Sequence, residues 1–237
     1  MAFLNILPDP DTKIDFSGIA DNTNGAAGPG FASVSLTSND KVMMNKTNTG
    51  RIITRKLATQ QWKVKISYNP LTRDEFEPVY NFLLYYGKLR PFYVELPQHK
   101  LSRNTGGSFD TSVVTSATNA GAQYIVAKNF SADSKADKPR PGDMFTVADS
   151  SDSLHEKMYR VLRVETPSVG QYEGTAPSSG TARIWTYPNI LRSISDSSPL
   201  TFQNPKMRVI MDKDVVSYSL NTDNLYKFDL QLTEALA

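Results

Sequence analysis

The chain has 237 residues, of which 39% are hydrophobic and 21% charged, a composition typical of one large folded domain or two small ones rather than of a disordered chain. Its 26 lysines and arginines nearly balance its 24 aspartates and glutamates, which excludes a global field strong enough to gather nucleic acid or an anionic membrane by charge alone. Without cysteine there are no disulfides, thiolate metal sites, iron–sulfur clusters or cysteine nucleophiles, and only His99 and His155 remain for acid–base or metal chemistry, which weakens most enzyme classes.

The first fifty residues show no targeting segment and little regular structure. Residues 1–7 are apolar, but they lack a basic segment and Pro8 interrupts them, so they do not resemble a secretory signal. No apolar run approaches the roughly 18 residues of a membrane span. Turn-forming residues dominate 8–50, and we expect only a short strand there, at Phe31–Leu36. We therefore expect a protein made in a cytoplasm and used there or in an assembly built there.

The first strong pattern is a strand over residues 61–68. Trp62, Val64, Ile66 and Tyr68 alternate with polar residues, which predicts one buried and one wet face. Asn69-Pro70 ends this strand, because proline cannot donate to a β-ladder.

A helix is predicted over residues 72–86. Thr72 and Glu75 have the spacing of a capping box, and an apolar stripe follows at helical spacing. Gly87 suits the left-handed stop of a helix, whereas Pro78 predicts a later start or a bend. A second strand is expected within 89–96, with Phe92, Val94 and Leu96 on one side.

The remainder is predicted to consist of short strands separated by turns. The Ser/Thr/Gly-rich segment 101–119 is expected to be a loop or a long hairpin arm, and the segment 166–180 a turn or loop. Four short strands are expected, at 124–127, 144–148, 158–164 and 183–187, and alternation continues in residues 207–211, 216–220 and 226–232.

These elements predict a mainly β (α+β) fold. We expect an antiparallel β-sandwich or split barrel with one supporting helix near residues 72–86, plus a small β-barrel-like region. Residues 1–100 with 198–237 are predicted to form the first domain, and residues 101–197 a small antiparallel barrel domain with Ser/Thr/Gly-rich loops.

No motif predicts catalysis, a cofactor or a metal. His155-Glu156 lacks the second histidine of a zinc-protease helix, so His155 is expected in a solvated loop, and His99 in an exposed turn. The acidic pairs lie where such residues cap helices or form turns: Asp74/Glu75, Asp133/Asp137, Asp149/Asp152 and Asp212/Asp214. We therefore predict no catalytic, cofactor-binding or metal-binding residue and no enzyme activity.

Basic residues cluster within 51–65 and at Lys138 and Arg140. Beside Trp62 and Tyr68 the first cluster could form a platform for single-stranded nucleic acid. The strand phase favours another interpretation, because it turns both aromatic rings inward, away from Lys63 and Lys65. No specific nucleic-acid binding is predicted, and the basic face could instead meet an acidic partner.

The chain resembles the distal tail proteins of tailed bacteriophages and their baseplate-hub relatives. The resemblance lies in the order of a basic strand, an aromatic alternating strand and a supporting helix, followed by a barrel and a last alternating strand. The segments that carry it are 51–68, 70–80, 82–84, 141–145, 157–161, 184–190 and 224–236. The segments 22–30, 101–119 and 166–180 depart from it.

This resemblance implies a structural virion protein that forms a ring, a hexamer rather than a trimer, at the distal end of the tail or in the baseplate. The ring would connect the tail tube protein to the tip or hub proteins, with DNA passing through its lumen and no membrane contact, and would be assembled in the host cytoplasm. Another tail or neck adaptor is an alternative. So is a carbohydrate-binding β module, whose exposed aromatic residues would be Tyr172, Trp185 and Tyr187.

Overall fold

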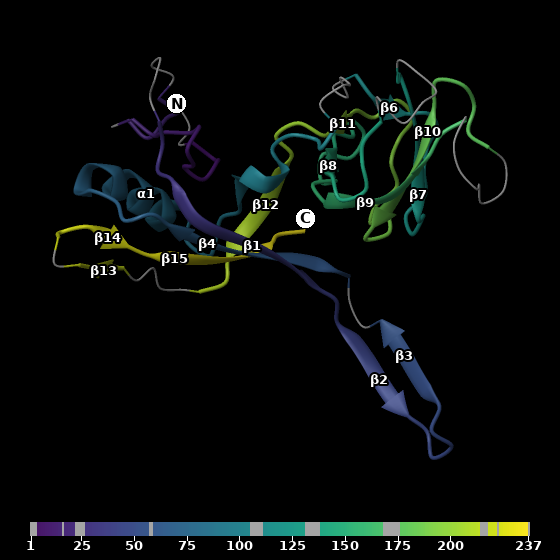
Figure 1. Cartoon of the computed structure of the whole chain (residues 1–237), viewed down its shortest axis with the longest axis horizontal. Coiled ribbons are helices and arrows are strands. Elements are labelled where there is room, and N and C mark those ends of the chain that lie inside the picture. Colours follow the sequence, from purple (N-terminus) through teal and green to yellow (C-terminus); the bar gives the residue numbers. More distant parts are fainter. Residues whose placement is uncertain are drawn as a thin grey trace. The chain divides into compact units, whose positions relative to one another are not determined.

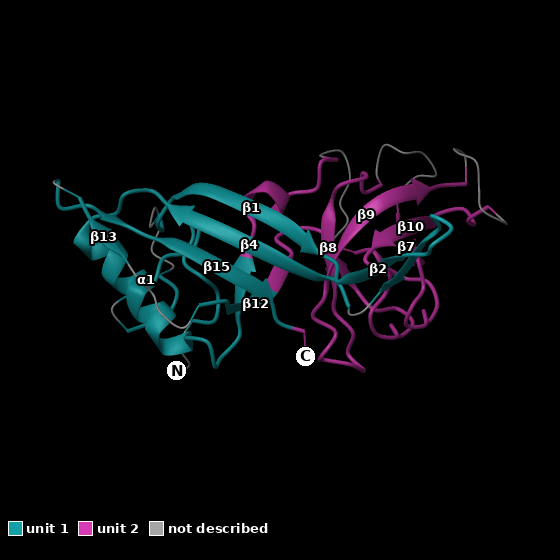
Figure 2. Cartoon of the chain, turned by 90° about the horizontal axis from the view of Figure 1, so that it is seen from below, with its two compact units in different colours: residues 1–94, 208–235 teal, residues 95–207, 236–237 magenta. Residues whose placement is uncertain are grey.

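The chain folds into two compact units (Figure 2). In the computed structural model the described residues are 4–15, 17–21, 27–56, 59–104, 111–130, 138–167, 176–213, 218–221 and 223–236. Unit 1 comprises residues 1–94 and 208–235, and unit 2 comprises residues 95–207 and 236–237. That the predicted ranges, 1–100 with 198–237 and 101–197, fold as independent domains remains a prediction.

Unit 1 is built on a five-stranded sheet in the order β1-β4-β15-β12-β5. Its neighbours β1–β4, β4–β15 and β15–β12 pair antiparallel. The strands are β1 (Phe31–Asn39), β4 (Gln61–Tyr68), β5 (Phe92–Glu95), β12 (Lys206–Met211) and β15 (Asp229–Glu234). Two two-stranded sheets accompany it, β2 (Val42–Lys46) with β3 (Ile52–Lys56) and β13 (Ser219–Leu220) with β14 (Tyr226–Lys227) (Figure 1).

Period-two alternation sets the inner face of this sheet, as predicted. Trp62, Val64, Ile66 and Tyr68 are all buried, while Lys63 and Lys65 between them are exposed. The register continues the apolar rows across the sheet, from β1 through β4 to β15. Burial of these rows is the main favourable contribution to the folding of unit 1.

The predicted helix is α1 (Arg73–Tyr86), which packs its apolar side on the sheet. The Phe76 ring stacks on Tyr226 at a centroid distance of 4.4 Å and meets Phe228 edge-on at 5.5 Å. The Glu75 carboxylate accepts hydrogen bonds from the backbone N–H and the hydroxyl of Thr72, at 2.9 and 2.8 Å. The helix therefore begins next to its predicted cap.

The expectation that Pro78 delays the helix is wrong. The helix starts at Arg73 and runs through Pro78 to Tyr86, because tertiary packing of the apolar side outweighs the one backbone hydrogen bond that proline cannot donate. It ends as predicted at Gly87, which has a φ of 52° and donates its N–H to the Leu83 carbonyl at 2.8 Å.

The expectation of loops over most of residues 8–50 is also wrong. Strand β1 extends to Asn39, and β2 and β3 form an antiparallel hairpin with partners from Val42↔Lys56 to Lys46↔Ile52. Gly50, at a φ of 83°, shapes the turn, in which the Thr47 N–H donates to the Arg51 carbonyl at 2.9 Å. We call residues 41–56 the arm.

Unit 2 is a six-stranded sheet in the order β11-β8-β9-β10-β7-β6. Its strands are β6 (Val113–Val114), β7 (Tyr124–Lys128), β8 (Met144–Val147), β9 (Met158–Glu165), β10 (Ala182–Tyr187) and β11 (Leu200–Thr201). Strand β6 returns toward β11, since Val114 exchanges backbone hydrogen bonds with Ser197 and Ser198 at 3.0 Å. The sheet is thereby nearly closed into a small barrel.

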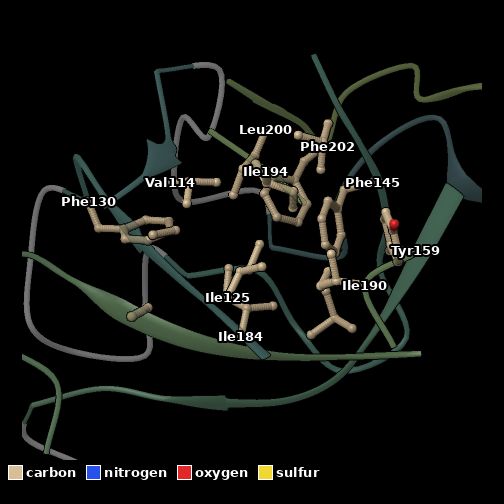
Figure 3. Packing of buried hydrophobic residues seen from close by; sticks show 14 residues of the cluster. Val114, Ile125, Phe130, Phe145, Tyr159, Ile184, Ile190, Ile194, Leu200 and Phe202 are labelled. Carbon is tan, nitrogen blue, oxygen red and sulfur yellow. The ribbon is translucent and has the colours of Figure 1, made fainter. Parts of the chain in front are cut away.

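The barrel encloses an apolar core (Figure 3). Side chains from all six strands and from residues 190–202 point toward one another, among them Phe145, Tyr159 and Phe202. The Phe145 ring lies 5.0 Å from Phe202 and 5.7 Å from Tyr159 between centroids. The predicted mainly β fold, with antiparallel sheets, one supporting helix near 72–86 and a small barrel-like region, is confirmed.

The remaining described segments add little regular structure. A single-turn 3₁₀ helix, η1 (Pro97–His99), follows β5. In the parts of the chain that the structure describes, no helix is long and apolar enough to cross a membrane. Residues 22–26, 105–110 and 168–175, which belong to the three segments that depart from the family pattern, lie outside the described residues.

Candidate functional site

The outer face of strands β1, β4 and β15, opposite α1, is polar and locally neutral. Three registered rows cross β1, β4 and β15, and they consist of Ser33/Ser67/Asp229, Ser35/Lys65/Gln231 and Thr37/Lys63/Thr233. Lys65 lies 3.9 Å from Asp229, and Lys63 lies 3.6 Å from Asp212. These exposed ion pairs contribute at most about 1 kcal/mol each to stability, but they cancel the positive charge of the face.

The arm is exposed on both of its faces. Five apolar side chains, Val42, Met43, Met44, Ile52 and Ile53, are each between 49% and 68% exposed. Because side chains alternate across a strand, Met43 and Ile53 lie on one face and the other three on the opposite face. An apolar surface of this extent is typical of a protein–protein contact.

A groove of about 110 Å³ lies beside the first turns of α1. Ile14, Pro29 and Val79 line it with apolar surface, and Asp74 and Glu75 lie at its edge. The backbone of the N-terminal segment closes against residues 27–30 here, since a side chain on Gly28 would meet the Asp9 carbonyl oxygen at 1.9 Å. The groove is therefore formed by packing of the N-terminal segment against the helix.

The predicted basic clusters separate into three environments. Arg51, Arg55 and Lys56 lie on the arm, whereas Lys63 and Lys65 lie on the outer face. Trp62 and Tyr68 point into the core, as predicted, so no exposed aromatic platform accompanies these cations. Of the second cluster, Arg140 is exposed, but Lys138 is buried with its ammonium 4.8 Å from the centre of the Phe130 ring.

The expectation of a solvated His155 is wrong. Its side chain is buried, and its Nε2 lies 2.8 Å from the Tyr159 hydroxyl. That hydroxyl also accepts a hydrogen bond from the Leu191 N–H at 3.0 Å, and a phenol can accept one hydrogen bond while it donates another. His99, expected in an exposed turn, is half-buried in η1, and burial lowers its pKa. Folding therefore recruits His155 as a structural hydrogen-bonding residue.

Acidification is expected to destabilise unit 2 through His155. Burial lowers the pKa of the imidazole against the opposing effects of Asp152 and Asp149, and Arg192 lowers it further. An unfolded histidine titrates near pH 6.5, so just below that pH the unfolded chain binds more protons than the folded one. The stabilisation is thus complete above about pH 6.5 and is lost as the pH falls through the lower folded pKa.

This dependence can be measured by urea unfolding between pH 7.5 and pH 5, followed by Trp185 fluorescence in a Trp62→Phe background. His99 also has a lowered pKa and contributes in the same range. A His155→Gln variant should therefore keep only the part of the slope that belongs to His99. A slope that is the same in both proteins would contradict the assignment to His155.

Among the predicted acidic pairs, Glu75 caps α1 and Asp149 and Asp152 form turns, whereas Asp212 pairs with Lys63. Asp149 accepts backbone hydrogen bonds from Ser151 and Ser195, both at 2.8 Å, and Asp152 accepts one from Leu154 at 3.1 Å. Asp133, Asp137 and Asp214 lie outside the described residues. Within the described ranges no group of three or more His, Asp or Glu side chains could hold a metal ion.

A buried ionic cluster on the barrel was not predicted from the sequence. Glu165 is buried and accepts from Arg183 at 2.8 Å, from the Trp185 indole N–H at 3.0 Å and from Arg163. The Arg163 guanidinium also lies 4.7 Å from the centre of the Trp185 ring, and Tyr124 packs 5.1 Å from that ring. Of the three aromatic residues proposed for sugar binding, Trp185 thus has internal partners, Tyr187 is partly buried, and Tyr172 lies outside the described residues.

Comparison with known proteins relates the chain to phage distal tail proteins. Residues 20–99 match the family described as "Distal tail protein pb9, A domain, N-terminal". The chain is also 27% identical over 236 residues to distal tail protein pb9 of Escherichia phage T5, with 97% of this chain and 99% of that protein covered. The resemblance inferred from the sequence is therefore confirmed.

Proposed function

We propose that the chain, which is similar to a phage distal tail protein, is a structural component of a virion tail and forms a closed ring that connects the tail tube to the tip or hub. We propose six copies rather than three, assembled in the host cytoplasm, in contact with the tail tube protein and with hub or other baseplate proteins, and without enzymatic activity or a cofactor. The observation that carries the proposal is the similarity to a distal tail protein along 97% of the chain.

The outer face of the unit 1 sheet supports a role as the wall of the lumen. A channel that DNA must traverse should not hold phosphates, and phosphate binding depends on unpaired Lys and Arg side chains. In the three rows of β1, β4 and β15 each lysine has an aspartate within 4 Å, and apart from Asp229 the remaining side chains are serine, threonine and glutamine. We therefore expect this face to be hydrated and to attract DNA only weakly.

The ring is tested by measuring the mass of the purified chain over a concentration series, with negative-stain images of the large species. We expect a closed ring of one fixed stoichiometry, six copies. A chain that stays monomeric at every concentration, both alone and when mixed with its tail tube protein, would overturn the proposal.

The lumen assignment predicts that removing two acids makes the ring bind DNA. In the double variant Asp212→Asn/Asp229→Asn, Lys63 and Lys65 lose their counter-charges, so we expect retention of linear duplex DNA at low salt and its release above roughly 0.2 M salt. Gel retardation and a salt titration measure both.

The matched control is Asp196→Asn/Asp223→Asn, which changes the net charge equally at exposed positions off this face. Equal DNA binding by the two double variants would show that net charge alone decides, and would contradict the lumen assignment.

A further inference from the structure

The arm lacks the contacts that an isolated hairpin needs. A two-stranded hairpin is at best marginally stable in water without a packed face. Here every residue of β2 and β3 is exposed, and apolar side chains lie on both faces. Covering either face would remove apolar surface from water, which points to a protein surface as the natural environment of the arm.

The charge of the arm restricts what can cover it. Five cations lie between residues 41 and 56, and no acidic residue does; the cations are Lys41, Lys46, Arg51, Arg55 and Lys56. Neighbouring cross-strand pairs place an apolar side chain next to a cation, as Met43 lies opposite Arg55 and Val42 opposite Lys56. A complementary surface must therefore offer an apolar depression next to carboxylates.

Such a surface exists on the same chain, at the groove beside α1. Its apolar lining includes Ile14, Pro29 and Val79. Its charged lining is Asp74, Glu75 and Lys13, and Lys13 pairs with Asp21 at 3.7 Å. Acidic residues outnumber basic ones in the sequence segments around it, 11–21 and 73–79; they are Asp11, Asp15, Asp21, Asp74, Glu75 and Glu77, against Lys13 and Arg73. The groove thus complements the arm, since it offers apolar surface and is surrounded by charge of the opposite sign.

The arm and the groove are attached at opposite ends of the unit 1 sheet. The arm continues from the end of β1 at Asn39 and leads into the start of β4 at Gln61, whereas α1 begins just after the far end of β4 at Tyr68. Eight residues of strand separate these ends by about 26 Å, so the base of the arm and the start of α1 lie at opposite ends of β4. The two surfaces therefore lie at opposite ends of the sheet.

We infer that the arm of one copy docks into the groove beside α1 of the next copy, so that this contact joins the subunits of the ring. Two different patches of one subunit that complement each other at opposite ends form a head-to-tail interface, which closes into a ring. The inference rests on the proposed ring and adds to it the two surfaces that join.

Cysteine cross-linking tests this contact, because the chain has no cysteine of its own. Met44→Cys places one thiol on the arm, and Ala27→Cys places one at the exposed edge of the groove. Under mild oxidation we expect the two single variants, carrying tags of different size, to form a mixed covalent dimer. The double variant should form a ladder of oligomers that stops at the ring size. Met44→Cys mixed with Leu154→Cys, an exposed position in unit 2, is the control.

Charge reversal gives an independent readout. Arg55→Glu/Lys56→Glu should weaken assembly at least about tenfold in concentration, and Asp74→Lys/Glu77→Lys in the same chain should restore much of it. The folding of the variants is checked by urea unfolding, followed by Trp62 fluorescence in a Trp185→Phe background. Curves that coincide with that of the parent protein would show that the variants are folded.

The outcomes separate this inference from the proposed ring. A ring of the expected mass without the Met44–Ala27 cross-link, or with equal cross-linking to Leu154→Cys, overturns the arm contact and leaves the ring proposal standing. A monomeric chain that also fails to cross-link overturns both. If charge reversal on the arm instead abolishes binding to duplex DNA or to anionic phospholipid vesicles while the ring mass is unchanged, the arm serves that ligand and the inference fails.

Discussion

Replacement of Trp62 by alanine is expected to lower the free energy of unfolding of unit 1 by about 3–5 kcal/mol. The indole is 3% exposed and lies in the inward-facing row of β4 together with Val64 and Ile66. Removing it deletes apolar contacts and leaves a cavity that the paired neighbours of β4 cannot close. Far-UV circular dichroism in a urea titration measures the loss. Trp185, then the only tryptophan, reports on unit 2 and should keep its midpoint.

Lys63→Ala is the matched control for this prediction. Lys63 neighbours Trp62 in the same strand but points to the outer face, so the change should cost less than about 1 kcal/mol. A loss below about 1 kcal/mol for Trp62→Ala would mean that the indole is not core. The aromatic side of β4 would then be a binding surface.

Replacement of Glu165 by alanine is expected to destabilise unit 2 by about 3–5 kcal/mol. The carboxylate is only 3% exposed and is the acceptor for Arg183, whose side chain is 11% exposed, as well as for the Trp185 indole. Without it the Arg183 charge loses this partner in a poorly hydrated position, and a buried charge that loses its counter-ion is costly. Urea unfolding followed by Trp185 fluorescence, in a Trp62→Phe background, measures the effect on unit 2.

Asp152→Asn is the comparison within the same unit. Asp152 pairs with Arg192, but their side chains are 25% and 37% exposed, so water screens the pair. We expect a cost below about 1 kcal/mol, since asparagine also retains the acceptor for the Leu154 N–H. If the two substitutions cost the same, the Glu165 cluster contributes no more than a surface ion pair.

The elements that the sequence predicted well are those with a buried and a wet side. Strand β4 was predicted from the alternation at Trp62–Tyr68, and helix α1 from the apolar stripe after Thr72. An element that packs one side on a core has apolar residues at the period of that element, which can be read from the sequence. The arm was missed for the same reason. With apolar and basic side chains on both faces, its strands have no alternation to detect, and only the turn-forming Thr47–Gly50 between two apolar runs suggested a hairpin.

The polar residues were predicted less well, since their environment depends on partners far away in the chain. His155 lies in a polar turn segment that suggests exposure, yet its side chain is buried and contacts the hydroxyl of Tyr159. Glu165 likewise reads as the wet end of a strand, and only the pairing of β9 with β10 brings Arg183 to it.

The sequence by itself determined the mainly β class, the single helix, the inward orientation of Trp62 and Tyr68, and the resemblance to distal tail proteins. Each of these depends only on local residue spacing and on the order of segments along the chain. Only the tertiary structure decided which polar groups meet, such as Lys63 with Asp212 and Lys65 with Asp229. It also decided that the arm and the acidic groove lie at opposite ends of one sheet. The local pattern predicts which face of a strand a side chain occupies. Which residues of other strands lie beside it on that face depends on strand pairing between segments more than a hundred residues apart.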